Sequence, residues 1–237
     1  MTPIFTDFVF KHRLGKKIRK SPDTPLFTKM HEKKAGTPTM AGILIWGTVL
    51  IFAVAIQNTP LGFLSRSETL LPLGIMVFAG LVGLIDDLKG VFAPINEGQG
   101  ISANSKLIAA GIIAILGAWW FTYKLGFTAI FVPFLGYIEL SFFSFLFFIL
   151  ILLATSLSAN ETDGIDGLAG GVLLFAFAAQ GVIAFVLGRY DLAAFIAAII
   201  GSLLAFLWFN VHPARFFMGD TGSLALGATL GTVAILT

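Results

Sequence analysis

Long apolar stretches alternate with short polar intervals along this chain, and the alternation predicts a bundle of membrane-spanning helices. The apolar runs approach the ~20 residues with which a helix crosses a bilayer, and they recur over the whole sequence. Because lipid cannot satisfy backbone hydrogen bonds, helices are the expected structure of such runs. We expect spans at residues 41–57, 71–85, 106–123, 141–157, 169–187, 191–209 and 224–237. Some of these are short, so their ends should extend into the neighbouring intervals.

The composition supports this interpretation and indicates the fold class. Of the 237 residues, 57% are apolar, 12% are charged and 25 are Phe, whereas a soluble domain of this length carries more charge. A soluble helical protein would also need amphipathic faces, which these runs lack. We therefore expect an all-α, polytopic helical membrane protein, with about seven spans in a single domain over residues 1–237. Cysteine is absent, which excludes disulfides, thiolate zinc sites and thiol nucleophiles.

Both ends of the sequence look like the interior of a longer protein. Residues 1–10 are mildly apolar and are followed, not preceded, by basic residues, which is the wrong order for a secretory signal. Residues 225–237 stop partway through an apolar run. We therefore expect a stretch that is truncated at both ends.

The distribution of Lys and Arg predicts the orientation of the bundle. Nine of the fifteen lie in the first polar interval, residues 11–34, and cytoplasmic intervals are the ones enriched in these residues. Placing that interval in the cytoplasm brings twelve of the fifteen to cytoplasmic ends and leaves Arg66, Lys124 and Arg189 outside. Because spans alternate in direction, we expect catalytic cytoplasmic loops at about 11–42, 86–105, 158–168 and 210–223.

One of the intervals on the opposite side predicts a different structure. Residues 127–140 contain Val132-Pro133-Phe134 and Gly136-Tyr137, in which turn-forming residues separate β-branched and aromatic side chains. This pattern is typical of a short β-hairpin, which we expect on the outer surface.

Three of the cytoplasmic intervals contain carboxylate clusters. The clusters are Asp86-Asp87-Leu88-Lys89, Asn160-Glu161-Thr162-Asp163-Gly164-Ile165-Asp166-Gly167 and Met218-Gly219-Asp220-Thr221-Gly222-Ser223. Carboxylates near lipid are costly and usually mark function. Since all three clusters fall on one side of the membrane, they predict a site there for a metal ion and an anionic substrate.

Each cluster also has a plainer interpretation. Asp86 and Asp87 end an expected helix, where polar residues are common, but carboxylates at that end oppose the helix dipole, which favours a functional role. Asp163 and Asp166 lie three residues apart, either on one face of a helical turn or in a solvated loop, and their spacing excludes an EF-hand. The Gly-rich turn around Asp220 is typical of an anion-binding helix start, although it lacks the Gly-Lys-Ser/Thr of a P-loop.

Sparse carboxylates near basic residues favour Mg²⁺ as the metal. This ion takes one or two protein carboxylates and completes its shell with water and substrate phosphates. The segment Lys33-Lys34-Ala35-Gly36-Thr37-Pro38-Thr39-Met40 offers cations and hydroxyls to such phosphates. The three histidines are scattered and predict no zinc site, and His212 is expected to cap or to lie at an interface.

Taken together, these motifs resemble those of the polyprenyl-phosphate N-acetylhexosamine-1-phosphate transferase superfamily. Its marks are an Asp-Asp pair ending a helix, an Asn-x-x-Asp-Gly-x-Asp-Gly loop and a Met-Gly-Asp-x-Gly-Ser turn. Two further segments resemble the bacterial phospho-N-acetylmuramoyl-pentapeptide transferases within it: Lys34-Ala35-Gly36-Thr37-Pro38-Thr39-Met40 and Asn210-Val211-His212-Pro213-Ala214-Arg215-Phe216-Phe217-Met218-Gly219-Asp220. The five motifs occur in order over nearly the whole chain.

The resemblance implies transfer of phospho-N-acetylmuramoyl-pentapeptide from UDP to undecaprenyl phosphate, which gives lipid I and UMP and requires Mg²⁺. It implies a multi-pass protein of the bacterial cytoplasmic membrane whose site faces the cytoplasm, with no nucleic-acid partner and a homodimer as a possible assembly. A covalent phospho-Asp and direct attack by the lipid phosphate are both compatible with it.

The resemblance also implies roles for individual residues. By position, Asp220 resembles the Mg²⁺ ligand, and Asp86 resembles the proposed base for the lipid phosphate, with Asp87 beside it. The residues that match the nucleotide cleft are Lys34, Thr39, Lys106, Asn160, Asp163, Asp166 and Asn210, together with Phe217, which matches an aromatic that stacks on uracil. The chain departs from the family at Met40-Ala41-Gly42, where Met-Gly-Gly is usual. It also lacks the first and the last few of about ten spans, including a His-rich loop expected beyond Thr237, so this stretch alone is expected to be inactive.

Three alternatives stay open at this stage. A related enzyme could transfer GlcNAc-1-phosphate to polyprenyl phosphate, although such relatives do not usually carry Gly36-Thr37-Pro38-Thr39-Met40 in this form. A cation-coupled transporter would place its carboxylates near mid-span, whereas here they cluster at span ends. A non-catalytic membrane scaffold would bear the cost of these carboxylates without using them.

Overall fold

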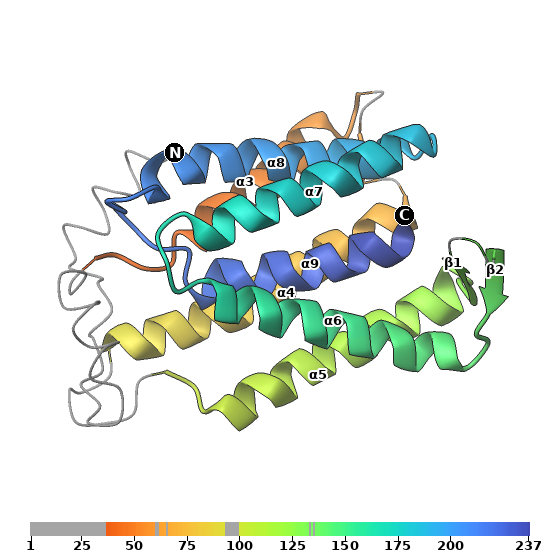
Figure 1. Ribbon diagram of the computed structural model, residues 1–237, viewed down its shortest axis with the longest axis horizontal. Coiled ribbons are helices and arrows are strands. Elements are labelled where there is room, and N and C mark those ends of the chain that lie inside the picture. The colour runs from red at the N-terminus through yellow and green to blue at the C-terminus, as the bar shows by residue number, and fades with distance from the viewer. Residues whose placement is uncertain (1–36, 60–61, 65, 93–99, 133, 135) are drawn as a thin grey trace.

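The computed structural model describes residues 37–59, 62–64, 66–92, 100–132, 134 and 136–237. Within these residues the chain forms a bundle of long helices lying side by side (Figure 1). The α-helices are α3 (Gly42–Ile56), α4 (Ser67–Phe92), α5 (Ala103–Trp119), α6 (Phe143–Thr162), α7 (Leu168–Val186), α8 (Tyr190–Asn210) and α9 (Asp220–Leu236). A π-helical turn, η2 (Trp120–Lys124), continues α5.

Every expected span corresponds to one of these helices. Five of them are long and apolar enough to cross a membrane, namely α4, α5 with η2, α6, α7 and α8. The other two, α3 and α9, are apolar as well but have only 15 and 17 residues. The prediction of a polytopic helical membrane protein is therefore confirmed.

The helix ends differ from the sequence-based expectation at all three acidic motifs. Helix α4 continues to Phe92, so Asp86 and Asp87 lie inside it rather than at its end. Helix α6 continues to Thr162 and includes Asn160, and α9 begins at Asp220. The expected intervals were too wide because polar residues were assigned to loops, whereas here tertiary contacts accommodate them within helices.

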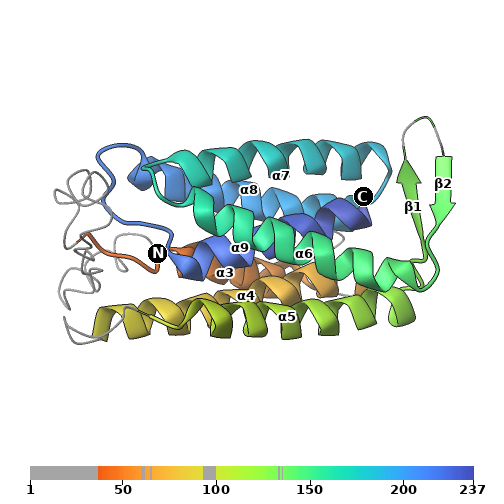
Figure 2. The same ribbon diagram turned by 60° about the horizontal axis from the view of Figure 1, so that its bottom comes forward.

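The predicted hairpin is present. Strands β1 (Ala129–Val132) and β2 (Gly136–Glu139) pair antiparallel, with Ala129 opposite Glu139 and Val132 opposite Gly136. The hairpin projects from one end of the bundle, and α9 begins at the other end (Figures 1 and 2).

Helix α9 occupies the middle of the bundle and is buried along nearly its whole length. It packs against α4 and α6 above all, and also against α3 and α7. Two glycines permit this closeness: a Cβ on Gly42 would lie 2.2 Å from Gly222 Cα, and one on Gly83 would lie 2.1 Å from Asp220 O. Small residues at helix crossings are typical of membrane bundles, where close backbone approach supplies the packing energy.

Charged side chains connect the helices at the hairpin end. Arg189 Nη1 donates a hydrogen bond to Leu236 O at 2.5 Å, at the last turn of α9. The same guanidinium lies 3.5 Å from Glu68 Oε2, and Arg66 Nε lies 2.5 Å from Asp191 Oδ2. These contacts connect α4, α8 and α9 at the end opposite the acidic motifs.

Candidate active site

Three carboxylates from two helices meet at the end of the bundle where α9 begins. Asp86 and Asp87 come from α4, and Asp220 is the first residue of α9. All three are buried, and one oxygen from each lies within 4.8 Å of the other two. A buried charge is stable only when paired, hydrogen-bonded or bound to a metal, so the neighbours of this cluster determine its chemistry.

Lys106, in the first turn of α5, bridges two of these carboxylates. Its Nζ lies 2.8 Å from Asp86 Oδ2 and forms a second, shorter contact with Asp220 Oδ2. The other oxygen of Asp86 accepts a hydrogen bond from Ile101 N at 2.5 Å. The backbone approaches closely here: Gly100 has φ +81°, and a Cβ on it would lie 2.6 Å from Asp86 Oδ1.

The cluster has the donor set and the charge for a hard divalent cation. Carboxylate oxygens are the ligands such ions prefer. Three ionised carboxylates with one ammonium leave two negative charges, which one divalent ion would balance. Among the described residues, Asp86, Asp87 and Asp220 can therefore hold a metal ion.

Thr221 connects Asp87 to the start of α9. Both its backbone N and its Oγ1 donate to Asp87 Oδ2, at 3.0 and 2.7 Å. The N-cap residue of α9, Gly219, has no side chain with which to cap the helix. Asp87 therefore caps α9 from the neighbouring helix, where a carboxylate also complements the positive end of the helix dipole.

The second acidic motif is attached to the same turn. Ser223 Oγ lies 3.1 Å from Asn160 Oδ1, and Gly219 N donates to Asp163 Oδ2 at 3.0 Å. Asn160 is in the last turn of α6, and Asp163 follows in the turn that leads to α7. The first turn of α9 is thus in contact with all the acidic motifs.

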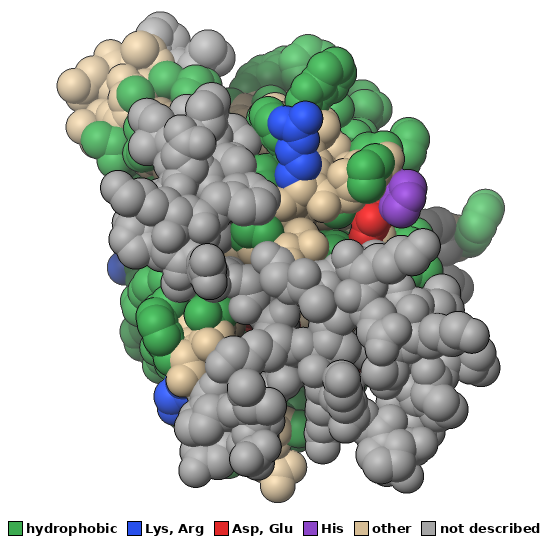
Figure 3. All heavy atoms as spheres, turned by 90° about the vertical axis from the view of Figure 1, so that its left-hand side faces the viewer, with side chains coloured by type: hydrophobic (Ala, Val, Ile, Leu, Met, Phe, Trp, Pro, Cys, Tyr) green, Lys and Arg blue, Asp and Glu red, His purple; other side chains and the backbone are tan. Residues whose placement is uncertain are grey.

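Asp166 makes a separate contact at the surface of this end. Its Oδ2 lies 2.9 Å from His212 Nδ1 and accepts a longer bond, 3.4 Å, from Ala214 N. Figure 3 shows this face, with a histidine against an acidic side chain. Asp163 and Asp166 are not on one helical face, because the chain turns between them and each reaches a different part of the segment before α9.

Asn210, the last residue of α8, is buried and braces the segment that carries His212. Its Oδ1 accepts from Gly167 N and its Nδ2 donates to Phe216 O, both at 2.9 Å. The contacts join the start of α7 to the segment between α8 and α9.

Of the two segments that extend the family resemblance, the described part of the first, from residue 37 on, lies against the second. Phe217 N donates to Pro38 O at 2.8 Å, and Phe217 O accepts from Ala41 N at 3.1 Å. Thr39 is buried, and a Cβ on Gly219 would lie 2.5 Å from its Oγ1. The side chain of Phe217, whose backbone makes these two hydrogen bonds, is half-buried.

The structure brings most of the sequence-predicted residues together at this end of the bundle, and their roles stay predictions. Lys34 lies outside the described residues. The sequence did not single out Thr221 and Ser223 as partners of Asp87 and Asn160, nor the backbone N–H of Ile101. The pattern Asp-Thr-Gly-Ser at a helix start was the available signal, since Ser and Thr hydroxyls near a helix end can also bond to groups outside the helix.

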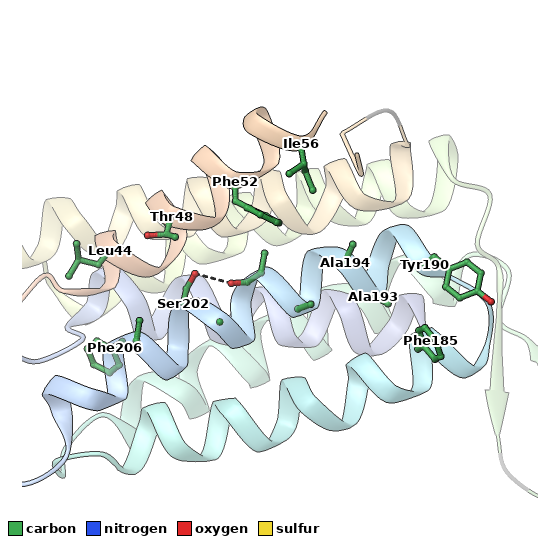
Figure 4. Close-up of a pocket in the computed structure, with 14 residues that line it drawn as sticks. Leu44, Thr48, Phe52, Ile56, Phe185, Tyr190, Ala193, Ala194, Ser202 and Phe206 are labelled. Carbon is green, nitrogen blue, oxygen red and sulfur yellow. Dashed lines mark hydrogen bonds between the residues drawn. The ribbon is translucent and has the colours of Figure 1, made fainter. Parts of the chain in front are cut away.

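A separate apolar groove lies away from this cluster. It has a volume of about 660 Å³ and runs between α3 and α8, with residues such as Phe52, Ala194 and Phe206 along it (Figure 4). Ser202 lines it as well, but its hydroxyl donates to Ala198 O at 2.8 Å. The described residues that line it include no acidic or basic side chain, so they do not offer the charges that a phosphate or a metal ion needs.

In sequence, the chain is similar to known proteins of one family. The model of "Glycosyl transferase family 4" matches residues 69–237. The phospho-N-acetylmuramoyl-pentapeptide-transferase of Geobacillus sp. (strain WCH70) is 40% identical over 241 residues, covering 100% of this chain and 71% of the relative. The enzymes of the same name from Shouchella clausii and Chloroflexus aurantiacus (strain J-10-fl) are 40% and 38% identical, covering 100% and 96% of this chain and 70% and 61% of the relatives.

Proposed function

The chain belongs to glycosyl transferase family 4 and, within it, to the phospho-N-acetylmuramoyl-pentapeptide-transferases, and we propose that it forms lipid I. The proposed reaction moves phospho-N-acetylmuramoyl-pentapeptide from its UDP donor to undecaprenyl phosphate and releases UMP. The identity of 40% across the whole chain carries this proposal. The meeting of all three acidic motifs around the first turn of α9 supports it, because the residues expected to bind diphosphate and metal are neighbours in space.

The metal in this proposal is Mg²⁺, held by Asp220 within the cluster of Asp86 and Asp87. The separation of at most 4.8 Å between their ligand atoms supports a shared ion, and their oxygens are hard donors suited to it. When bound, the ion would offset the negative charge of the diphosphate. Lys106 supplies a second positive charge between Asp86 and Asp220.

Asp86 is the proposed base for the lipid phosphate, with Asp87 beside it. The second ionisation of a phosphate monoester has a pKa of about 6, so only a weak base is needed to complete its deprotonation. An oxygen of that phosphate would then form a bond to the sugar-linked phosphorus, and the bond from that phosphorus to the UMP oxygen would break. One diphosphate replaces another, so the residues contribute mainly by positioning and by balancing charge.

The remaining residues form the proposed nucleotide cleft. Its members are Lys34, Thr39, Lys106, Asn160, Asp163, Asp166, Asn210 and Phe217, with Phe217 stacking on uracil. Asn160 and Asp163 bond directly to the first turn of α9 or its cap, which supports a position beside the cluster. Asn210 is more deeply placed, and its contacts support a bracing role for the segment that carries Phe217.

The protein is a membrane protein, and the proposed setting is the bacterial cytoplasmic membrane with the acidic end facing the cytoplasm. There a soluble sugar nucleotide can meet a lipid acceptor at the membrane edge. A single catalytic domain is part of this proposal, and a homodimer stays a prediction.

The test is a transfer assay on the protein as its gene encodes it, purified in detergent, with undecaprenyl phosphate and two alternative donors. UDP-N-acetylmuramoyl-pentapeptide should be consumed only when Mg²⁺ is present, and UDP-GlcNAc should be refused. Consumption of UDP-GlcNAc instead would place the protein among the GlcNAc-1-phosphate transferases. A folded protein inactive with both donors would contradict the proposal.

A further inference from the structure

The hydroxyl of Thr221 differs from the other threonine hydroxyls of α9. Thr229 Oγ1 and Thr232 Oγ1 donate to the carbonyls of Ala225 and Ala228, four residues earlier, at 2.7 and 2.8 Å. This is the usual bond of a threonine inside a helix. Thr221 Oγ1 instead donates to Asp87 Oδ2 on α4, at 2.7 Å.

The position of Thr221 in the chain explains the difference. The carbonyl four residues before it belongs to Phe217, precedes the helix and accepts a hydrogen bond from Ala41 N. The hydroxyl is therefore directed away from its own helix. Together with the backbone N–H of the same residue, it places two donors on a single carboxylate oxygen in a fully buried position.

We propose that Thr221 is a positioning residue for the acidic cluster, setting the orientation of the Asp87 carboxylate relative to Asp86 and Asp220. Both donors hold Oδ2 of Asp87 against the start of α9, so the loss of the hydroxyl would weaken the hold on the position of the carboxylate. The proposal deepens the proposed function and rests on it, since it assigns how one carboxylate of the metal-binding cluster is held. Groups that orient metal ligands typically change metal affinity or activity by 10–100-fold when removed.

The space around the contact between Thr221 and Asp87 is too small for the carboxylate to move freely. A Cβ on Gly219 would lie 2.3 Å from Asp87 Oδ2, and a Cβ on Gly83 would lie 2.1 Å from Asp220 O. With so little space between α4 and the start of α9, a carboxylate that turned would displace its neighbours. Displacements of about 1 Å at a reacting centre can cost about a hundredfold in rate.

The test compares Thr221→Val, which keeps the shape but loses the hydroxyl, with Thr221→Ser, which keeps the hydroxyl. Thr229→Val is the matched control, since Thr229 is equally buried on the same helix and its hydroxyl bonds to backbone. Two quantities are measured on the protein as encoded: steady-state transfer with UDP-N-acetylmuramoyl-pentapeptide, and binding of Mn²⁺ followed by electron paramagnetic resonance.

For Thr221→Val we expect kcat to fall by about 10–100-fold and the Kd for Mn²⁺ to rise by at least about fivefold. The KM for the sugar nucleotide should change by less than about threefold, because ground-state nucleotide contacts are untouched. Thr221→Ser should recover most of both quantities, and Thr229→Val should match the wild type.

The inference would be overturned if Thr221→Val kept the wild-type kcat and Mn²⁺ affinity, or if Thr221→Ser were as impaired as Thr221→Val. The second result would assign the effect to packing of the methyl group. If Thr221→Val does not fold, Thr221→Ala also removes the hydroxyl but does not add a second methyl group. Thr229→Ala is then its matched control. If the wild type does not transfer the sugar phosphate, the proposed function fails, while Mn²⁺ binding still tests Thr221.

Discussion

At the scale of single residues, the candidate site is organised by charge balance rather than by any one side chain. Lys106 lies between Asp86 and Asp220, and Thr221 bonds to Asp87, so each carboxylate of the cluster has a partner from another element or turn. Such partners are what make buried carboxylates tolerable in the absence of a metal. Removing one should therefore change how strongly the protein depends on divalent cations.

Lys106→Met gives a direct test of this balance. Without the ammonium, three carboxylates repel one another, so the thermal midpoint in EDTA should fall by a few degrees, as a loss of about 2 kcal/mol would produce in a domain of this size. Added Mg²⁺ should raise the midpoint of the variant more than that of the wild type, since binding to the folded state stabilises it. The measurement is a thermal unfolding scan with and without the ion.

Lys124→Met provides the control for this experiment. Lys124 lies at the hairpin end, 4.3 Å from the centre of the Trp120 ring, and is exposed. Its variant should respond to Mg²⁺ as the wild type does. An equal response of the two lysine variants would argue against a metal site around Lys106.

At the scale of elements, the decisive feature is how closely α9 approaches α4. The hydrophobic pattern predicted both helices, because long apolar runs leave few alternatives in a membrane. It did not predict where they end, since Asp86 and Asp87 were assigned to a helix terminus but lie inside α4. The two aspartates are accommodated there by Lys106 and Thr221, which belong to other helices. The order of apolar and polar residues within one segment does not predict contacts of this kind.

The approach of α4 to α9 predicts different outcomes for two glycines of α4. Gly83→Ala would place a methyl group 2.1 Å from Asp220 O, so the start of α9 must move. We expect a loss of about 1–3 kcal/mol in stability, as for other overpacked sites, and at least a tenfold loss of transfer activity.

Gly74→Ala is the matched comparison, because a Cβ there meets nothing within 4 Å. Alanine favours a helix over glycine by about 0.5–1 kcal/mol, so this variant should be as stable as the wild type or slightly more so. Thermal midpoints and transfer rates of the two variants decide the matter. If Gly83→Ala behaved like Gly74→Ala, the close contact would have no role in holding Asp220.

At the scale of the whole molecule, the bundle has two unlike ends. The acidic motifs gather at one end, and the hairpin with the Arg189 and Arg66 contacts occupies the other (Figures 1 and 2). Counting Lys and Arg and alternating the spans was enough to predict that the motifs share an end. It was not enough to predict which oxygens meet, because that depends on helix rotation and on glycines such as Gly42 and Gly83, which have a large effect only where another backbone passes.

Which end of the bundle faces the cytoplasm is a prediction that single introduced cysteines can test. Residues 1–237 contain no Cys, so any cysteine that the gene encodes outside them is first replaced by Ser, and the introduced thiol is then the only reactive one. Phe134 at the hairpin tip and Ile165 near the acidic end are both exposed, at 106% and 61%. The probe is a maleimide that cannot cross the cytoplasmic membrane but can reach its outer surface in intact cells. It should label Phe134→Cys but not Ile165→Cys in intact cells, and it should label both once the cytoplasmic membrane is opened. Labelling of Ile165→Cys alone in intact cells would show that the acidic end faces away from the cytoplasm. A cytoplasmic sugar nucleotide could then not reach the acidic cluster.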